Sequence, residues 1–166
     1  MQHLTIKRRW WHRLFQTLAA TDFGIWLLAS RLHQLDAPVL RWTKNRTSLT
    51  SWLTGLPVIM LETRGTKTGL PRRTPLVALV DGDKIILIAS YFGSKRHPAW
   101  YYNLKAHPQA VVFASGETFR YYARQAEGVE HARYYKMAEA VYPGYALYKH
   151  KAGSRTIPVM VLEPKG

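Results

Sequence analysis

The residues best suited to chemistry in this chain are positive charges grouped near two glycines. Arg64, Lys67, Arg72 and Arg73 follow one another with no acid between them, and Lys67 lies in the loop that runs from Gly65 to Gly69. Glycine lets a backbone approach a ligand closely, and loop N–H groups beside a lysine can bind an anion. Two interpretations are open, namely a phosphate site and a solvated basic turn.

A second acid-free run supports a positively charged face. It lies between Asp83 and Glu117 and contains Lys84, Lys95, Arg96 and Lys105. Both basic runs flank segments that we expect to form β-hairpins. The pattern therefore indicates that the positive charges gather on one side of the domain.

Tyrosines form the second group of candidates. Tyr142, Tyr145 and Tyr148 recur at every third position, which places them on one side of a helical turn. Such a row forms an aromatic wall for a flat substrate or simply packs in the core. Both interpretations are open from the spacing.

Several kinds of active site are excluded by missing motifs. The chain has no Gly-x-Ser-x-Gly elbow, no His-Glu-x-x-His and no Gly-x-Gly-x-x-Gly turn. The Gly65–Gly69 loop is no Walker loop, because Pro71 and a predicted strand follow it rather than a helix. The seven histidines lack metal-ligand spacing, so we predict no metal site. With no evident nucleophile or acid–base pair, a bound cofactor is expected to carry the chemistry.

Composition narrows the class of protein and of partner. The 166 residues suit one domain, and a hydrophobic content of 47% excludes a disordered chain. The absence of cysteine excludes disulfides, thiolate zinc sites and iron–sulfur clusters, and it fits a reducing cytosol. The net charge of +14 calls for an anionic partner: a nucleic acid, a membrane surface or a polyanionic small molecule.

Residues 1–50 are predicted to form an N-terminal helical segment. The apolar stretch 14–29 is interrupted by polar residues and is too short to span a bilayer. A stripe of Trp10, Trp11, Leu14, Phe15 and Leu18 at helical spacing has basic neighbours. This stripe packs on the domain, contacts a membrane surface or belongs to a cleaved signal. We expect a cytoplasmic protein, with contact of residues 1–30 to the inner face of the cell membrane as an open alternative.

The rest of the chain, residues 51–166, is predicted to form the cofactor-binding domain. A helix over 34–55 precedes a strand at 58–63, and hairpins are expected at 74–80 with 85–90 and at 110–114 with 118–124. A helix lies between Pro98 and Pro108, another spans 128–141, and 156–162 forms the last strand. This order predicts an α+β barrel of mostly antiparallel strands.

Six segments together resemble the deazaflavin-dependent nitroreductase family, a branch of the split β-barrel flavin and deazaflavin reductases. They are Leu61–Gly69, Pro71–Pro75, Asp81–Asp83, His97–Leu104, Tyr142–Tyr145 and Arg155–Pro158. The resemblance covers about residues 50–164. It implies a split β-barrel of the FMN-binding type that binds coenzyme F420, whose anionic phosphate and oligoglutamate tail suit the positive charge.

The resemblance also implies roles for individual residues. The three tyrosines 142, 145 and 148 match aromatic positions on the acceptor side of the family's pocket. The expected catalytic group is a hydroxyl of Tyr145 or Tyr148, or a water, which would supply the proton that follows the hydride. The implied cofactor-binding residues are Thr66, Lys67, Thr68, Arg72, Arg73, Thr74, Pro75, Leu76, Val77, Ile88, Ala89, Ser90, Tyr91, Ala99, Trp100, Tyr101, Tyr102 and Asn103. The chain departs from the family at Thr66, where arginine is common, and at Tyr91–Phe92, where a small or polar pair is usual.

The expected function is that of an F420H2-dependent reductase. Hydride would pass to an electron-poor acceptor: an activated alkene, a quinone or a nitro compound. FMN and FAD are alternative cofactors. A non-catalytic carrier of F420 or a flavin is the first alternative function, and a nucleic-acid-binding module is the second, although no nucleic-acid partner is expected.

Overall fold

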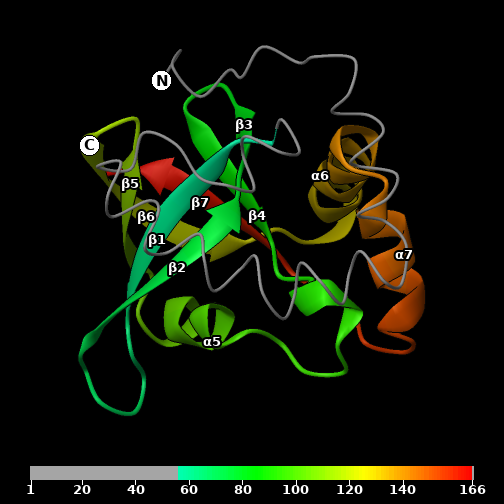
Figure 1. Cartoon of the computed structure of the whole chain (residues 1–166), viewed down its shortest axis with the longest axis horizontal. Coiled ribbons are helices and arrows are strands. Elements are labelled where there is room, and N and C mark those ends of the chain that lie inside the picture. Colours follow the sequence, from blue (N-terminus) through cyan, green and yellow to red (C-terminus); the bar gives the residue numbers. More distant parts are fainter. Residues whose placement is uncertain (1–55, 166) are drawn as a thin grey trace.

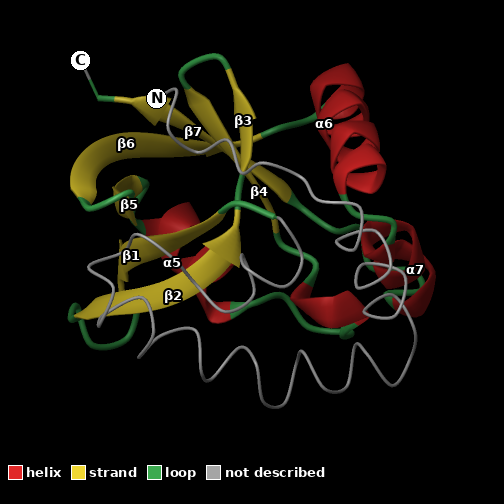
Figure 2. Ribbon diagram, turned by 45° about the horizontal axis from the view of Figure 1, so that its top comes forward, coloured by secondary structure: helices red, strands yellow, loops and turns green. Residues whose placement is uncertain are grey.

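One antiparallel sheet organises the residues that the computed structural model describes, 56–165 (Figure 1). Every neighbouring pair in the strand order β2-β1-β5-β6-β7-β4-β3 is antiparallel. The sheet curls strongly, so that it forms a half-barrel (Figure 2). The strands are β1 (Val58–Arg64), β2 (Pro71–Val77), β3 (Leu79–Asp81), β4 (Lys84–Ile88), β5 (Gln109–Ala114), β6 (Glu117–Gln125) and β7 (Val159–Pro164).

Three helices and one short turn of 3-10 helix accompany the sheet. Helix α5 (Ala99–Ala106) packs on β1, and α6 (Gly128–Val141) packs against α7 (Gly144–Lys151) and β4. The 3-10 turn η3 (Tyr91–Gly93) contacts α7. Figure 1 shows α6 and α7 together beyond one side of the sheet, with α5 below it. The α+β class is therefore confirmed, whereas the helices predicted before residue 56 lie outside the described residues.

The neighbouring strands β4 and β7 are buried on both faces over most of their length, which explains their nearly continuous apolar sequence. Ile85 and Leu87 pack in the cluster that includes Trp100 of α5, and Ile86 and Ile88 pack in the cluster under α6 and α7. Successive side chains of a strand point to opposite faces, so one strand serves both clusters. The two clusters hold the helices that border the site in fixed positions.

The predicted strand 74–80 is divided in the structure at Ala78. Residues up to Val77 pair with β1, whereas Leu79–Asp81 pair with β4, because the curled sheet brings this segment across from one half to the other. The Ala78 N–H still donates to Pro57. The last strand begins at Val159 rather than at Thr156, since the ladder to β4 starts only after Pro158.

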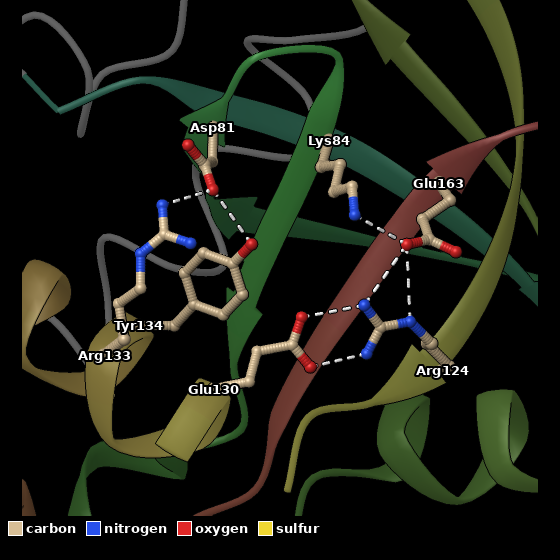
Figure 3. A network of polar contacts seen from close by, with 7 residues as sticks. All are labelled: Asp81, Lys84, Arg124, Glu130, Arg133, Tyr134 and Glu163. Atoms are coloured by element: carbon tan, nitrogen blue, oxygen red, sulfur yellow. Dashed lines mark hydrogen bonds and ion pairs between the residues drawn. The ribbon is translucent and has the colours of Figure 1, made fainter.

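A network of charged side chains fastens the start of α6 to the sheet (Figure 3). Arg124 of β6 binds both carboxylate oxygens of Glu130 at 2.6 and 2.8 Å and also binds Glu163 of β7. Lys84 of β4 lies 2.9 Å from the same Glu163 oxygen. These contacts lower the pKa of Glu130, chiefly through Arg124, and the pKa of Glu163, chiefly through Lys84 and then Arg124.

Because these carboxylates have lowered pKa values in the folded state, their contribution to stability is present at neutral pH and is lost as the pH falls through those values. Arg124→Ala is expected to lower the free energy of unfolding by about 1 kcal/mol at neutral pH, since the groups are partly exposed. Urea denaturation should show this difference shrinking below the ordinary carboxylate pKa of 4.5. Arg120→Ala, which breaks no ion pair within the described chain, is the control. An undiminished difference in acid would contradict the assignment.

Candidate functional site

A cavity of about 310 Å³ opens between β2, the end of β4, η3, α5 and the turn from α6 to α7. Its volume is in the range of sites that bind small organic molecules. Most of its wall is apolar or aromatic. The lining residues are Leu56, Val58, Thr74, Pro75, Leu76, Val77, Leu87, Ile88, Ser90, Tyr91, Phe92, Pro98, Ala99, Trp100, Tyr142, Tyr145 and Tyr148.

The β2 strand borders this cavity with its backbone as well as its side chains. Four consecutive residues, 74–77, line it, and β2 is an edge strand of the sheet. Successive residues of β2 alternately bond to β1 and point their main-chain groups to the open edge. The Gly65 N–H donates to Leu70 and the Ala78 N–H donates to Pro57, so the even-numbered residues of this ladder bond to β1. The main-chain groups of Pro75 and Val77 therefore point to the open edge. Pro75 therefore loses no ladder hydrogen bond, and the strand presents backbone groups to a ligand.

The three tyrosines of the α6–α7 turn face one another across the cavity wall. Their ring centroids are 5.7 to 6.1 Å apart, and the rings of Tyr142 and Tyr148 are each nearly perpendicular to that of Tyr145. The hydroxyls of Tyr142 and Tyr148 lie 3.5 Å apart. Tyr135 holds this turn, because its hydroxyl donates to the Tyr145 carbonyl at 2.9 Å. All three tyrosines thus border one cavity while they also pack in the core cluster, so the structure contains both arrangements that the spacing left open.

The Tyr145 hydroxyl has no hydrogen-bond partner among residues 56–165, although the residue is only 6% exposed. No buried side-chain oxygen or nitrogen of the described chain is left unsatisfied, so this hydroxyl must reach open space. The space that its ring borders is the cavity. The cavity therefore contains a donor that a ligand can use.

Burial keeps these tyrosines protonated. It is the main cause that raises the pKa of Tyr142, Tyr145 and Tyr148 above the ordinary value of 10.0. Their hydroxyls are consequently neutral donors throughout the physiological pH range. They can stabilise a developing negative charge by hydrogen bonding, whereas complete transfer of their proton is unfavourable.

Gly144 lets the Tyr142 ring fold over the first turn of α7. A Cβ at this position would overlap that ring, whose hydroxyl oxygen would be only 2.6 Å away. Gly144→Ala is expected to displace Tyr142 and to lower the free energy of unfolding by about 1–3 kcal/mol, the usual cost of overpacking. Thermal unfolding and tyrosine near-ultraviolet circular dichroism measure the two effects. Ala146→Gly at an exposed position of α7 is the comparison for backbone effects alone, and a wild-type spectrum and stability in Gly144→Ala would refute the expectation.

The loop after β1 is tied to α5 by an asparagine. The Asn103 side chain accepts from the Thr66 N–H at 3.2 Å and donates to the buried Thr63 hydroxyl at 3.0 Å. Gly69 donates to the Gly65 carbonyl, whereas the N–H groups of Lys67 and Thr68 have no acceptor within the described chain. Asn103 thus holds the loop in a conformation that leaves two adjacent backbone donors available.

Three of the four positive charges around this loop have no acidic partner in the described part of the chain. Within residues 56–165, no carboxylate forms an ion pair with Arg64, Lys67 or Arg72. The Thr68 hydroxyl instead accepts from Arg72 Nη2 at 3.4 Å, which keeps that guanidinium beside the loop. Unpaired cations together with free N–H groups form a site suited to a phosphate.

Not every predicted residue reaches the cavity. Arg73 forms an ion pair with Glu62 at 2.7 Å and lies over the Phe113 ring. The Tyr101 hydroxyl donates to Gln125, and Tyr102 is half exposed on α5. The loop residues 66–68, Arg72, Ala89 and Asn103 are also outside the lining. The lining includes twelve predicted residues: Thr74, Pro75, Leu76, Val77, Ile88, Ser90, Tyr91, Ala99, Trp100, Tyr142, Tyr145 and Tyr148.

Five lining residues were not assigned to the site from the sequence: Leu56, Val58, Leu87, Phe92 and Pro98. Most are ordinary apolar residues of strands or strand ends, so no local signal separates them from the core. Phe92 adopts a positive φ of 55° beside Tyr91 at 48°. These backbone angles, which are rare outside glycine, turn both side chains to the cavity and are not predictable from residue type.

A metal site and a membrane-spanning helix are both absent from the part of the chain that the structure describes. No group of three or more His, Cys, Asp or Glu residues there is arranged to hold a metal ion. Nor does any helix between residues 56 and 165 have the length and hydropathy needed to cross a membrane.

Comparison with known proteins identifies the family. Residues 37–164 match the family described as F420H(2)-dependent quinone reductase. An F420H(2)-dependent quinone reductase of Mycobacterium tuberculosis is 37% identical over 109 residues, which are 64% of this chain and 72% of the relative. A second putative F420H(2)-dependent quinone reductase of that organism is 28% identical over 66% of this chain and 92% of the relative.

Solved structures agree with this assignment. The structure of an F420-H2 dependent reductase, FDR-A, has a TM-score of 0.60 and 36% identity to this chain, and the match covers 64% of this chain and 94% of that one. A protein of unknown function from Agrobacterium tumefaciens, Atu2129, has the same fold at a TM-score of 0.52 and 19% identity; the match covers 67% of this chain and 49% of that one. The sequence match, which spans most of the chain, and the shared fold lead to one conclusion: this chain belongs to the F420H(2)-dependent quinone reductase family.

Proposed function

We propose that the cavity beside β2 receives the ring system of F420 together with a quinone, and that the Gly65–Gly69 loop binds the cofactor's phosphate. Family membership makes the chain an F420H2-dependent oxidoreductase that reduces quinones, with F420 as its cofactor, as the sequence predicted. Of the three predicted acceptor classes, a quinone is the one that the family description names. The observation that carries the assignment of the cavity is the Tyr145 hydroxyl, which has no hydrogen-bond partner among residues 56–165 and belongs to a buried residue that lines the cavity.

The residues present fit this cofactor. A flat, largely apolar ring suits a cavity walled by Trp100, Ile88 and the tyrosines, and the edge of β2 offers backbone donors and acceptors for its polar rim. An anionic phosphate suits the Lys67 ammonium and the N–H groups of Lys67 and Thr68. The two parts are linked, because α5 borders the cavity with Trp100 and ties down the loop with Asn103.

When bound, F420H2 supplies a hydride to the acceptor. The protein's own contribution is to hold donor and acceptor in contact and to keep water out with apolar walls. As the quinone gains the hydride, negative charge grows on its oxygen, and a neutral Tyr145 hydroxyl can donate a hydrogen bond there. Since burial raises the pKa of this hydroxyl, water at the open mouth of the cavity, beside the half-exposed Tyr91, is the better source of the one proton that completes the hydroquinone.

Equilibrium titration of the full chain with F420, FMN and FAD tests the cofactor assignment. Quenching of tryptophan fluorescence reports binding, because Trp100 borders the cavity. We expect saturable binding of F420 that is at least about tenfold tighter than that of FMN or FAD. All three molecules carry phosphate, but only F420 has the oligoglutamate tail, which adds at least one charge-assisted contact to the cations beside the loop. An affinity for FMN equal to that for F420 would contradict this expectation and would favour a flavin as the cofactor.

Residues 51–166 are proposed as the cofactor domain and residues 1–50 as a separate helical segment with a membrane-facing stripe. Lys7, Arg8, Arg9 and Arg13 beside the aromatic residues favour an anionic bilayer, each by about 1 kcal/mol at most. Deleting residues 1–30 is expected to reduce sedimentation with anionic vesicles and to leave F420 affinity unchanged. Loss of the cofactor or precipitation of the shortened chain would instead assign the segment to the core.

A further inference from the structure

One wall of the cavity has an unusual backbone conformation. Tyr91, Phe92 and Gly93 have consecutive positive φ angles of 48°, 55° and 77°. Tyr91 and Phe92 line the cavity, and Phe92 meets the Tyr148 ring edge-on with centroids 5.9 Å apart. Left-handed angles at residues other than glycine cost free energy and persist only where the surroundings enforce them.

Arg155, in the segment between α7 and β7, is bound to both ends of this turn. Its Nη2 donates to the Ser90 carbonyl at 2.6 Å, and its Nη1 donates to the Ala89 carbonyl at 3.3 Å. Its Nε donates to the Ser94 carbonyl at 2.8 Å. The guanidinium therefore joins the residues before Tyr91 to the residue after Gly93.

The other contacts of Arg155 are consistent with this role. The guanidinium lies 3.0 Å from Nδ1 of His97, and the pKa of that ring is lowered, first by burial and then by the charge of Arg155. A neutral His97 ring can accept at this nitrogen. No carboxylate of residues 56–165 pairs with Arg155, and Arg155 does not line the cavity. Within the described residues, its hydrogen bonds therefore go to three backbone carbonyls and to the His97 ring.

We propose that Arg155 is a positioning residue, which holds the turn 89–94 so that Tyr91 and Phe92 form the acceptor side of the cavity. This inference rests on the proposed function of the cavity. A planar guanidinium spans three carbonyls that point from different directions. A lysine ammonium keeps the charge but bonds from a single point, so it cannot bridge both ends of the turn equally well.

Hydrogen exchange of the full chain tests the structural half of the proposal. The Gly93 N–H donates to Ser90, and the Ser94 N–H donates to Tyr91, so both report on the turn. Arg155→Ala is expected to speed their exchange about tenfold or more, the effect of losing a hydrogen bond from a charged donor. The Ala126 N–H, which donates to Val159 in the sheet, should keep its rate. Equal acceleration at Ala126, or none at Gly93 and Ser94, would overturn the proposal.

Steady-state kinetics with a soluble naphthoquinone test the functional half. Arg155→Ala should raise KM for the quinone by about fivefold or more while changing F420 affinity and kcat less, because one wall of the acceptor space is loosened. Arg155→Lys should be intermediate, and it carries the test if the alanine variant fails to fold. Arg133→Ala is the matched control, because it removes from α6 an arginine that is paired with Asp81 of β3.

The two hypotheses fail in different ways. If the wild-type chain oxidises no F420H2 with quinone, the proposed function fails, whereas hydrogen exchange still decides whether Arg155 holds the turn. If the wild type is active and both Arg155 variants keep its KM, the positioning role is refuted.

Discussion

Tyr145→Phe is expected to lower kcat for quinone reduction by about a hundredfold, which is the usual cost of removing one preorganised donor to a developing negative charge. The ring remains, so its nearly perpendicular contacts with Tyr142 and Tyr148 are kept. F420 affinity should therefore change little. Stopped-flow oxidation of bound F420H2 by quinone measures the effect without the contribution of cofactor binding.

Two variants make this result specific. Tyr122→Phe removes a hydroxyl from a half-exposed position on β6 outside the cavity and should leave kcat unchanged. Tyr148→Phe removes one member of the hydroxyl pair with Tyr142 and should have a smaller effect than Tyr145→Phe. A wild-type kcat in Tyr145→Phe would show that this hydroxyl is not the donor.

Lys67→Ala is expected to weaken F420 binding about tenfold or more, because it removes a charge-assisted contact to the cofactor's phosphate. The backbone donors of Lys67 and Thr68 remain, since Asn103 still holds the loop at Thr66. The dissociation constant from fluorescence titration gives the effect. Raising the salt concentration should weaken F420 binding to the wild type more than to the variant, because the variant lacks the Lys67 charge that salt screens.

Lys136→Ala, on the exposed side of α6, controls for the loss of one positive charge. It should leave the dissociation constant unchanged. If both lysine variants weaken binding equally, the chain attracts the cofactor by its net charge of +14 rather than through the loop.

Most elements of the described chain were predictable because each has a local signal. Pro98 and Pro108 delimit α5, and Ser115–Gly116 form the turn of the hairpin between β5 and β6, both with positive φ. The three-residue spacing predicted that Tyr142, Tyr145 and Tyr148 lie on one side but left open whether they form a wall or pack in the core; in the structure they line the cavity and also belong to the core cluster.

What the sequence did not reveal depends on contacts between distant segments. The strand predicted over 74–80 breaks at Ala78 because its two halves pair with different strands of the curled sheet. Arg155 reaches carbonyls 61 to 66 residues away in the chain. Tyr91 and Phe92 take left-handed angles that their residue types disfavour, and the tertiary contacts of the turn override that preference.

The central claim is that this chain passes a hydride from F420H2 to a quinone. The most direct measurement is the quinone-dependent oxidation of F420H2 by the purified full chain, followed by the return of the absorbance of oxidised F420. The account predicts a rate that is proportional to protein concentration and saturates with quinone, and that falls by about a hundredfold in Tyr145→Phe. Tight binding of F420H2 with no protein-dependent oxidation would contradict it and would identify a cofactor carrier.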